Sequence, residues 1–230
     1  MYDSNVECRL SYHAADVEYS YGDKWRSLEN VENITVDSGE RVYFRYVGDE
    51  YLSGEVLTST TKTFDVGGDI RTVIYGNKKV KSVSDYELKG LFSGTNVVNT
   101  NQLLMMFNSV GVSGYESMFK NCTSLISAPE LPATTLADSC YNSMFSGCTS
   151  LTTAPELPAT TLAEGCYSNM FSGCSNLNYI NCLATDMSAA NCTKYWVLGV
   201  ASTGTFVKAA GTSWSTGTGG IPEGWTVEEV

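Results

Sequence analysis

The sequence predicts a mixed α/β fold: a short right-handed solenoid between an N-terminal all-β sandwich domain and a C-terminal β-hairpin cap. Three observations predict it. Residues 117–142 and 143–168 agree at 19 of 26 positions. Residues 1–88 contain short runs rich in Val, Tyr, Phe and Thr, and residues 201–230 are rich in Gly, Ser and Thr. We therefore expect three domains, at 1–88, 89–200 and 201–230.

The 26-residue period indicates three to four stacked coils, because one such unit cannot bury its apolar side alone. A further, degenerate copy begins near Leu91, where the sequence Leu-Phe-Ser-Gly resembles Met-Phe-Ser-Gly in the later copies. The side chains expected to line the shared interior recur with this period: Phe119, Cys122, Leu125, Cys140, Phe145, Cys148, Leu151, Cys166, Phe171, Cys174, Leu177 and Cys192.

Each coil is expected to pair one short helix with one short strand. Apolar residues between 136 and 145 recur at a spacing close to four, which is typical of a helix with one buried stripe. Gly147 then supplies a helix stop, and the extended segment 151–157 is interrupted by Pro155, which lacks a backbone donor. Strands on one side and helices on the other describe a leucine-rich-repeat coil.

One repeated motif resembles a known family. Phe-x-x-Cys-x-x-Leu occurs at 119–125, 145–151 and 171–177, and Leu-Pro follows at 131–132 and 157–158. This pattern resembles the BspA-like leucine-rich repeats of surface proteins from gut Bacteroidetes. The resemblance implies a leucine-rich-repeat solenoid, a location at the cell surface or in the secreted fraction, and a role in adhesion.

The flanking domains read as β structure. Six runs are predicted to be strands of a small antiparallel sandwich, with Trp25 in its core and His13 as a polar strand residue: 6–12, 17–21, 31–36, 41–47, 61–66 and 70–75. Residues 205–208 and 225–228 are predicted to pair as a hairpin that closes the solenoid. The alternative is that Trp214 and Trp225 form an aromatic platform for a sugar.

Charge and hydropathy exclude several partners. The chain has 14 Lys and Arg residues against 25 Asp and Glu residues, a net charge of -11. This charge repels phosphate backbones, so nucleic acid and anionic membranes are poor partners. No run of 18 apolar residues is present, so no membrane-spanning segment is expected, and the first residues do not resemble a signal peptide.

The eight cysteines do not resemble a zinc framework, because six of them follow the repeat rather than a CxxC spacing. Buried free thiols are the preferred interpretation, with disulfides between the two columns as the alternative. Neither a metal nor a cofactor is expected. A search for a nucleophile with a nearby base, or for phosphate-binding loops, finds nothing, so the sequence does not predict an enzyme.

We therefore expect a monomeric binding or adhesion module for a host or bacterial surface protein or a glycan. A phage virion or tail-associated protein is the alternative, and a glycan-active enzyme accessory a weaker one. The residues predicted to form the binding surface lie on the strand side of the coils: Ser127, Pro129, Glu130, Thr153, Pro155 and Glu156. Glu130 and Glu156 form either an acidic recognition strip or simply a solvated face.

Overall fold

The computed structural model describes residues 6–8, 17–20, 22–24, 26–27, 34–36, 43–46, 63–70 and 82–230. Trp25 and His13 lie outside these residues. The strands are β1 (Val6–Cys8), β2 (Val17–Ser20), β3 (Arg26–Ser27), β4 (Ile34–Val36), β5 (Tyr43–Tyr46), β6 (Phe64–Asp69), β7 (Ser82–Val83), β8 (Val97–Leu104), β9 (Ser109–Val110), β10 (Thr135–Leu136), β11 (Tyr179–Cys182), β12 (Thr205–Lys208) and β13 (Thr226–Glu229).

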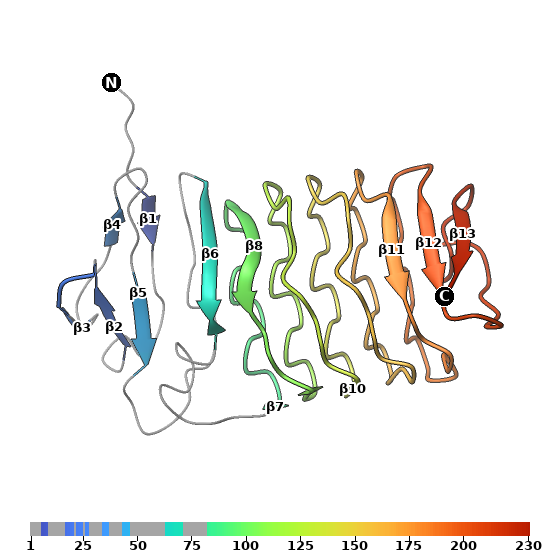
Figure 1. Ribbon diagram of the computed structural model, residues 1–230, viewed down its shortest axis with the longest axis horizontal. Coiled ribbons are helices and arrows are strands. Elements are labelled where there is room, and N and C mark those ends of the chain that lie inside the picture. The colour runs from blue at the N-terminus through green and yellow to red at the C-terminus, as the bar shows by residue number, and fades with distance from the viewer. Residues whose placement is uncertain are drawn as a thin grey trace.

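Residues 82–230 form successive coils that lie side by side, which we call the coil stack (Figure 1). One side of it, the strand side, carries β8, β11, β12 and β13, which point the same way in Figure 1. β11, β12 and β13 pair in parallel in that order. A second parallel sheet, ordered β10-β9-β7, forms a corner of the coils.

Proline interrupts the strand side in the middle of the stack. Between β8 and β11 the strand contacts are single bridges, such as Thr153 with Tyr179 and Leu157 with Cys182. Pro155 lies between the two bridged residues and offers no N–H to a neighbouring strand. The interruption predicted at Pro155 is confirmed.

The predicted mixed α/β class is wrong. Residues 82–230 form strands, turns and extended segments and no α-helix. The segments expected to be helical are continuous runs of turns, and they make up the other side of the coils, which we call the turn side: 85–94, 112–121, 138–147, 164–173 and 190–199. Because a leucine-rich-repeat coil was predicted from strands alternating with helices, that assignment falls with the helices.

The turn runs are held by two alternating sets of backbone hydrogen bonds. Tyr141 and Phe145 donate their N–H groups to the carbonyls of Cys166 and Met170 in the next coil, both at 3.0 Å. Met144, between them, donates instead to Tyr141 O within its own coil, at 3.1 Å. From residue 139 to 147 every backbone N–H has a carbonyl acceptor, and every second acceptor lies in the next coil.

A left-handed backbone conformation every fourth residue makes this pattern possible. In one coil it occurs at Ser139 (φ 56°), Ser143 (φ 56°) and Gly147 (φ 77°), and the neighbouring coils repeat it. Glycine tolerates this conformation best, and small polar residues more readily than bulky ones. The period of four also explains the wrong prediction, because it places apolar side chains almost as a helix of 3.6 residues per turn would.

The interior is filled by ladders of identical side chains. The rings of Phe92, Phe119, Phe145 and Phe171 stack in register, with centroids 5.3, 5.6 and 5.7 Å apart. A second ladder runs parallel to it through Tyr115, Tyr141 and Tyr167. Since each ring is fully or almost fully buried, consecutive coils share one continuous core.

The C-terminal end is closed by aromatic packing and not by a hairpin. The ring of Trp196 ends both ladders by packing on Tyr167 and Phe171, and Trp214 stacks on Trp196 with a centroid distance of 5.6 Å. The segments predicted to pair, 205–208 and 225–228, do lie side by side, but β12 and β13 run parallel. The predicted β-hairpin is therefore wrong, because a hairpin requires antiparallel strands.

The N-terminal residues that are described form antiparallel pairs. β1 pairs with β4, and β2 pairs with both β3 and β5. β6 differs, since it pairs in parallel with β8, and Ile70 after it belongs to the same core cluster as the coils. β6, which precedes the expected boundary at residue 88, thus continues the strand side of the coil stack.

Candidate binding surface

The strand side carries a line of mostly uncharged polar residues, one from each coil. Bridges and strand register link Asn99 to Ser127, then Thr153 to Tyr179, Tyr179 to Thr205 and Thr205 to Thr226. We call these six residues the polar column. Neighbouring strands lie about 4.8 Å apart, so a ligand that extends along the stack meets one of these side chains per coil.

The N-terminal end of the polar column is fixed by side-chain hydrogen bonds. Asn99 donates from Nδ2 to Asp65 Oδ1 at 2.8 Å, and Ser127 Oγ donates to Asn99 Oδ1 at 3.0 Å. Asp65 belongs to β6, so this chain of bonds joins three consecutive strands. These side chains are committed to each other and are less available to a partner.

The structure places the predicted surface residues unequally. Glu130, Thr153 and Glu156 are exposed, whereas Ser127 and Pro155 are half-buried. Pro129 is buried, so the prediction that it lies on the surface is wrong. The exposed part of the predicted surface thus reduces to Glu130, Thr153 and Glu156.

Sequence reasoning did not identify Tyr179, which has the largest side chain in the polar column. Its side chain is 36% exposed. The two residues on either side of it in register are the threonines of β12 and of the preceding coil. The only signal in the sequence was that the third copy places Tyr where the second has Thr153, and the divergence of that copy obscured the comparison.

The predicted core residues lie in the interior. Each of these side chains is at most 4% exposed: Phe119, Cys122, Leu125, Cys140, Phe145, Cys148, Leu151, Cys166, Phe171, Cys174, Leu177 and Cys192. They support the surface from within.

One cysteine column has a specific hydrogen-bonding role. Cys122, Cys148 and Cys174 each donate from Sγ to the carbonyl of the phenylalanine one coil earlier, at 3.0, 3.1 and 3.0 Å. The seven cysteines whose side chains are described are all free and buried. Burial raises the pKa of the Cys166, Cys174 and Cys182 thiols to about 12. Thiols held neutral in this way are poor nucleophiles and metal ligands.

The described residues contain no group of three or more His, Cys, Asp or Glu side chains that could hold a metal ion. A shallow surface hollow in the described part of the chain is lined in part by Met187, Asn191, Cys192 and Lys194. None of the described segments forms a helix with the length and apolarity needed to cross a bilayer.

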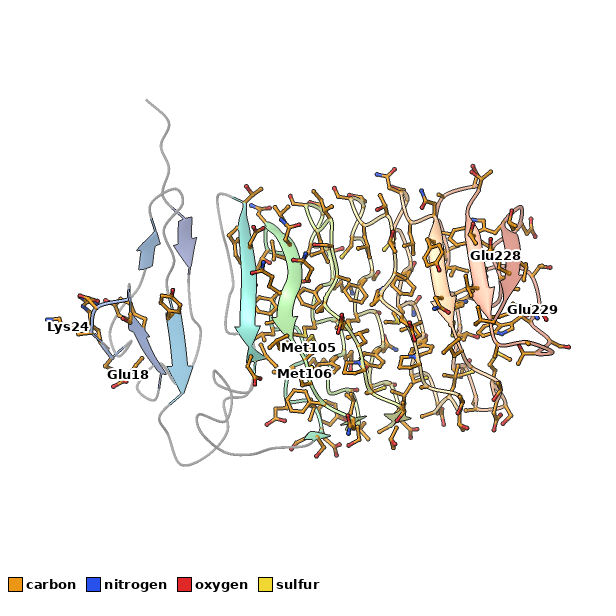
Figure 2. The ribbon with its side chains drawn as sticks, in the orientation of Figure 1. Glu18, Lys24, Met105, Met106, Glu228 and Glu229 are labelled. Atoms are coloured by element: carbon orange, nitrogen blue, oxygen red, sulfur yellow. The ribbon has the colours of Figure 1, made fainter. Side chains whose placement is uncertain are left out.

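The two tryptophans considered as a sugar platform serve packing. Trp225 is 7% exposed and donates from Nε1 to Ala201 O at 2.8 Å. Trp214 packs between Trp196 and Phe206 at the end of the core. Because these faces are occupied by protein, Trp214 and Trp225 do not form an exposed platform. β13 pairs with β12 at the C-terminal end of the stack, where Glu228 and Glu229 lie (Figure 2).

Comparison with known proteins found no match for this chain among protein-family models, curated proteins or solved structures.

Proposed function

We propose that this protein is a non-catalytic binding module that presents the strand side of its coils to a surface protein or a glycan. It acts as a monomer at a cell surface or in the secreted fraction. The repeated Phe-x-x-Cys-x-x-Leu motif, which resembles that of BspA-like surface proteins, supports this location. The proposal concerns recognition only, and the partner is a macromolecule or an extended chain long enough to contact several coils.

The observation that carries the proposal is the register of the coils. The ring centroids of Phe119 and Phe145 lie 5.6 Å apart, and those of Phe145 and Phe171 lie 5.7 Å apart. Surface residues 26 positions apart are therefore also held in line. A shared aromatic core keeps this surface rigid, and a rigid surface loses little conformational entropy when it binds. Repeat proteins commonly use such extended surfaces for recognition.

The two sides of the coils supply a matched pair of acidic sites for the test. Glu130 and Glu156 lie on the strand side, and Asp138 and Glu164 lie 26 residues apart at the start of the turn runs. All four are exposed. The two double variants, E130A/E156A and D138A/E164A, therefore remove the same charge from opposite sides of the stack.

The experiment is capture from extracts of host mucosal surfaces and bacterial surfaces on the immobilised full chain. We expect E130A/E156A to reduce capture of the partner at least threefold, D138A/E164A to leave it unchanged, and both to keep the wild-type melting temperature within about 2 °C because solvated surface residues contribute little. Equal capture by the wild type and both variants, or equal loss in both, contradicts binding through the strand side.

A further inference from the structure

Tyr179 interrupts an otherwise small-residue column. At this position the coils carry Ser127, Thr153, Thr205 and Thr226. Each of these has a short hydroxyl side chain that suits a strand. The coil that contains Tyr179 is the one place in this part of the column where a large ring replaces it.

The ring does not serve the interior. Along β11 the exposed and buried side chains alternate, with Ile180 and Cys182 fully buried and Tyr179 pointing to the opposite face. The side chain is 36% exposed, so part of its aromatic surface remains in contact with water. Threonine at the same register in the neighbouring coils shows that the fold needs no ring there.

The surroundings of the ring are polar and hydrogen-bonding. Thr153 and Thr205 flank it in register on the two sides, at a strand spacing of about 4.8 Å. Asn178, the preceding residue, is exposed as well. Hydroxyl and carboxamide groups both donate and accept hydrogen bonds, so they complement the hydroxyl groups of a sugar.

We propose that Tyr179 is a stacking platform for one pyranose ring of an uncharged glycan, with Thr153 and Thr205 hydrogen-bonding to its hydroxyl groups. This inference rests on the proposed function and names the class of its partner. The C–H bonds on one face of a pyranose carry partial positive charge and pack on the negative face of an aromatic ring. The hydroxyl groups of the two threonines then hydrogen-bond to the hydroxyl groups at the edge of the same sugar ring.

The charge of the chain selects a neutral glycan. The net charge is -11, and Glu156 lies exposed on the same side, immediately before the Leu157 that bridges β11. Uronic acids, sulfated sugars and sialic acids would be repelled by these carboxylates. Neutral hexose or pentose polymers carry no such penalty.

The test is affinity gel electrophoresis of the full chain in gels that contain amylopectin, xylan or galactomannan, with polygalacturonate as the anionic comparison. We expect at least one neutral polymer to retard the wild type and polygalacturonate not to. Tyr179→Thr, which inserts the residue of the neighbouring coils and so preserves the fold, is expected to weaken binding at least tenfold. Tyr179→Phe is expected to keep most of it, because the ring remains.

Tyr195→Ala is the matched control, because Tyr195 is 48% exposed on the turn side. It is expected to bind like the wild type. The inference is overturned if no neutral polymer retards the wild type, or if Tyr179→Thr binds as well as Tyr195→Ala.

The same variants separate the two proposals. If capture from surface extracts survives periodate oxidation of the glycans but is lost in E130A/E156A, the strand side binds a protein. The proposed function then stands and the glycan inference fails. If capture is lost on oxidation and in Tyr179→Thr alike, both stand.

Discussion

The turn side and the strand side of the coils use the same 26-residue period for different ends. On the turn side, backbone hydrogen bonds recur at every second residue from coil to coil, as at Tyr141, Ser143 and Phe145. On the strand side, prolines reduce the contacts in the middle of the stack to single bridges. The side with the denser backbone contacts between coils in the middle of the stack is therefore not the side that we propose faces a partner.

Residues that differ between 117–142 and 143–168 lie on both sides, and the two sides constrain them differently. The turn side requires a residue that tolerates the left-handed conformation at every fourth position, with apolar rings between them. The strand side needs only an outward-pointing side chain at each step of the polar column, and it accepts serine, threonine or tyrosine. Variation on the strand side is thus possible without loss of the fold.

The largest contrast between the two sides is expected from truncating a stacked ring. Phe145 contacts rings of both adjacent coils, so Phe145→Ala is expected to lower the free energy of unfolding by about 3–5 kcal/mol. On the strand side, Glu156→Ala is expected to change it by less than about 0.5 kcal/mol. Urea denaturation followed by fluorescence measures both, and similar values would show that the stacked core does not dominate stability.

The thiols give the next largest effect, through pH. Burial raises the pKa of Cys166, Cys174 and Cys182 from the ordinary value of 9.0 to about 12. Between these values the folded chain keeps protons that the unfolded chain releases, so stability is complete below pH 9 and falls as the pH rises. The loss approaches about 1.4 kcal/mol per thiol per pH unit.

Denaturant midpoints at pH 8, 9 and 10 test this dependence. Cys174→Val removes one titrating thiol and keeps a small apolar side chain, so its midpoint is expected to fall less steeply above pH 9 than that of the wild type. A midpoint that stays constant up to pH 10 would mean that these thiols are not protected from solvent.

Backbone conformation on the turn side gives a smaller effect. Gly147 has φ 77°, and a Cβ there would lie 2.5 Å from Asn121 Oδ1 in the preceding coil. Gly147→Ala is expected to cost about 1–2 kcal/mol. Ser146→Ala, one residue away and outside the left-handed set, serves as the control with an expected change below about 0.5 kcal/mol. Equal effects would argue against the four-residue turn pattern.

The smallest effect is expected where the strand side is interrupted. Pro155→Ala removes a restriction on the unfolded chain without removing a hydrogen bond, so it is expected to destabilise by about 0.4–1 kcal/mol. A loss above about 2 kcal/mol would show that the strand side contributes more to stacking than its bridges indicate. Thermal unfolding by circular dichroism resolves the two cases.

Part of this organisation was accessible from the sequence. The period identifies which residues share the interior, because Phe119, Phe145 and Phe171 recur at one spacing and nothing else in the chain competes with it. The helices were predicted wrongly because apolar residues every fourth position fit a helix and a run of turns almost equally well. The distinguishing signal is the set Ser139, Ser143 and Gly147, small residues at the positions of positive φ.

The surface was less predictable than the core. Glu130 and Glu156 are exposed as their repetition suggested, but Pro129 is buried and Tyr179 was missed. Periodicity reports only on positions that stay the same, whereas recognition depends on positions that differ between coils. The parallel pairing of β12 and β13 was also hidden, because strand composition does not specify direction.

The most direct test of the account is measurement by NMR of scalar couplings across hydrogen bonds in the deuterated full chain. We predict couplings from the amide nitrogens of Tyr141, Ser143 and Phe145 to the carbonyl carbons of Cys166, Ser168 and Met170, respectively. Couplings from the same nitrogens to carbonyls four residues earlier in the chain would mean that this side is helical, and would contradict the stacked turns on which the whole account depends.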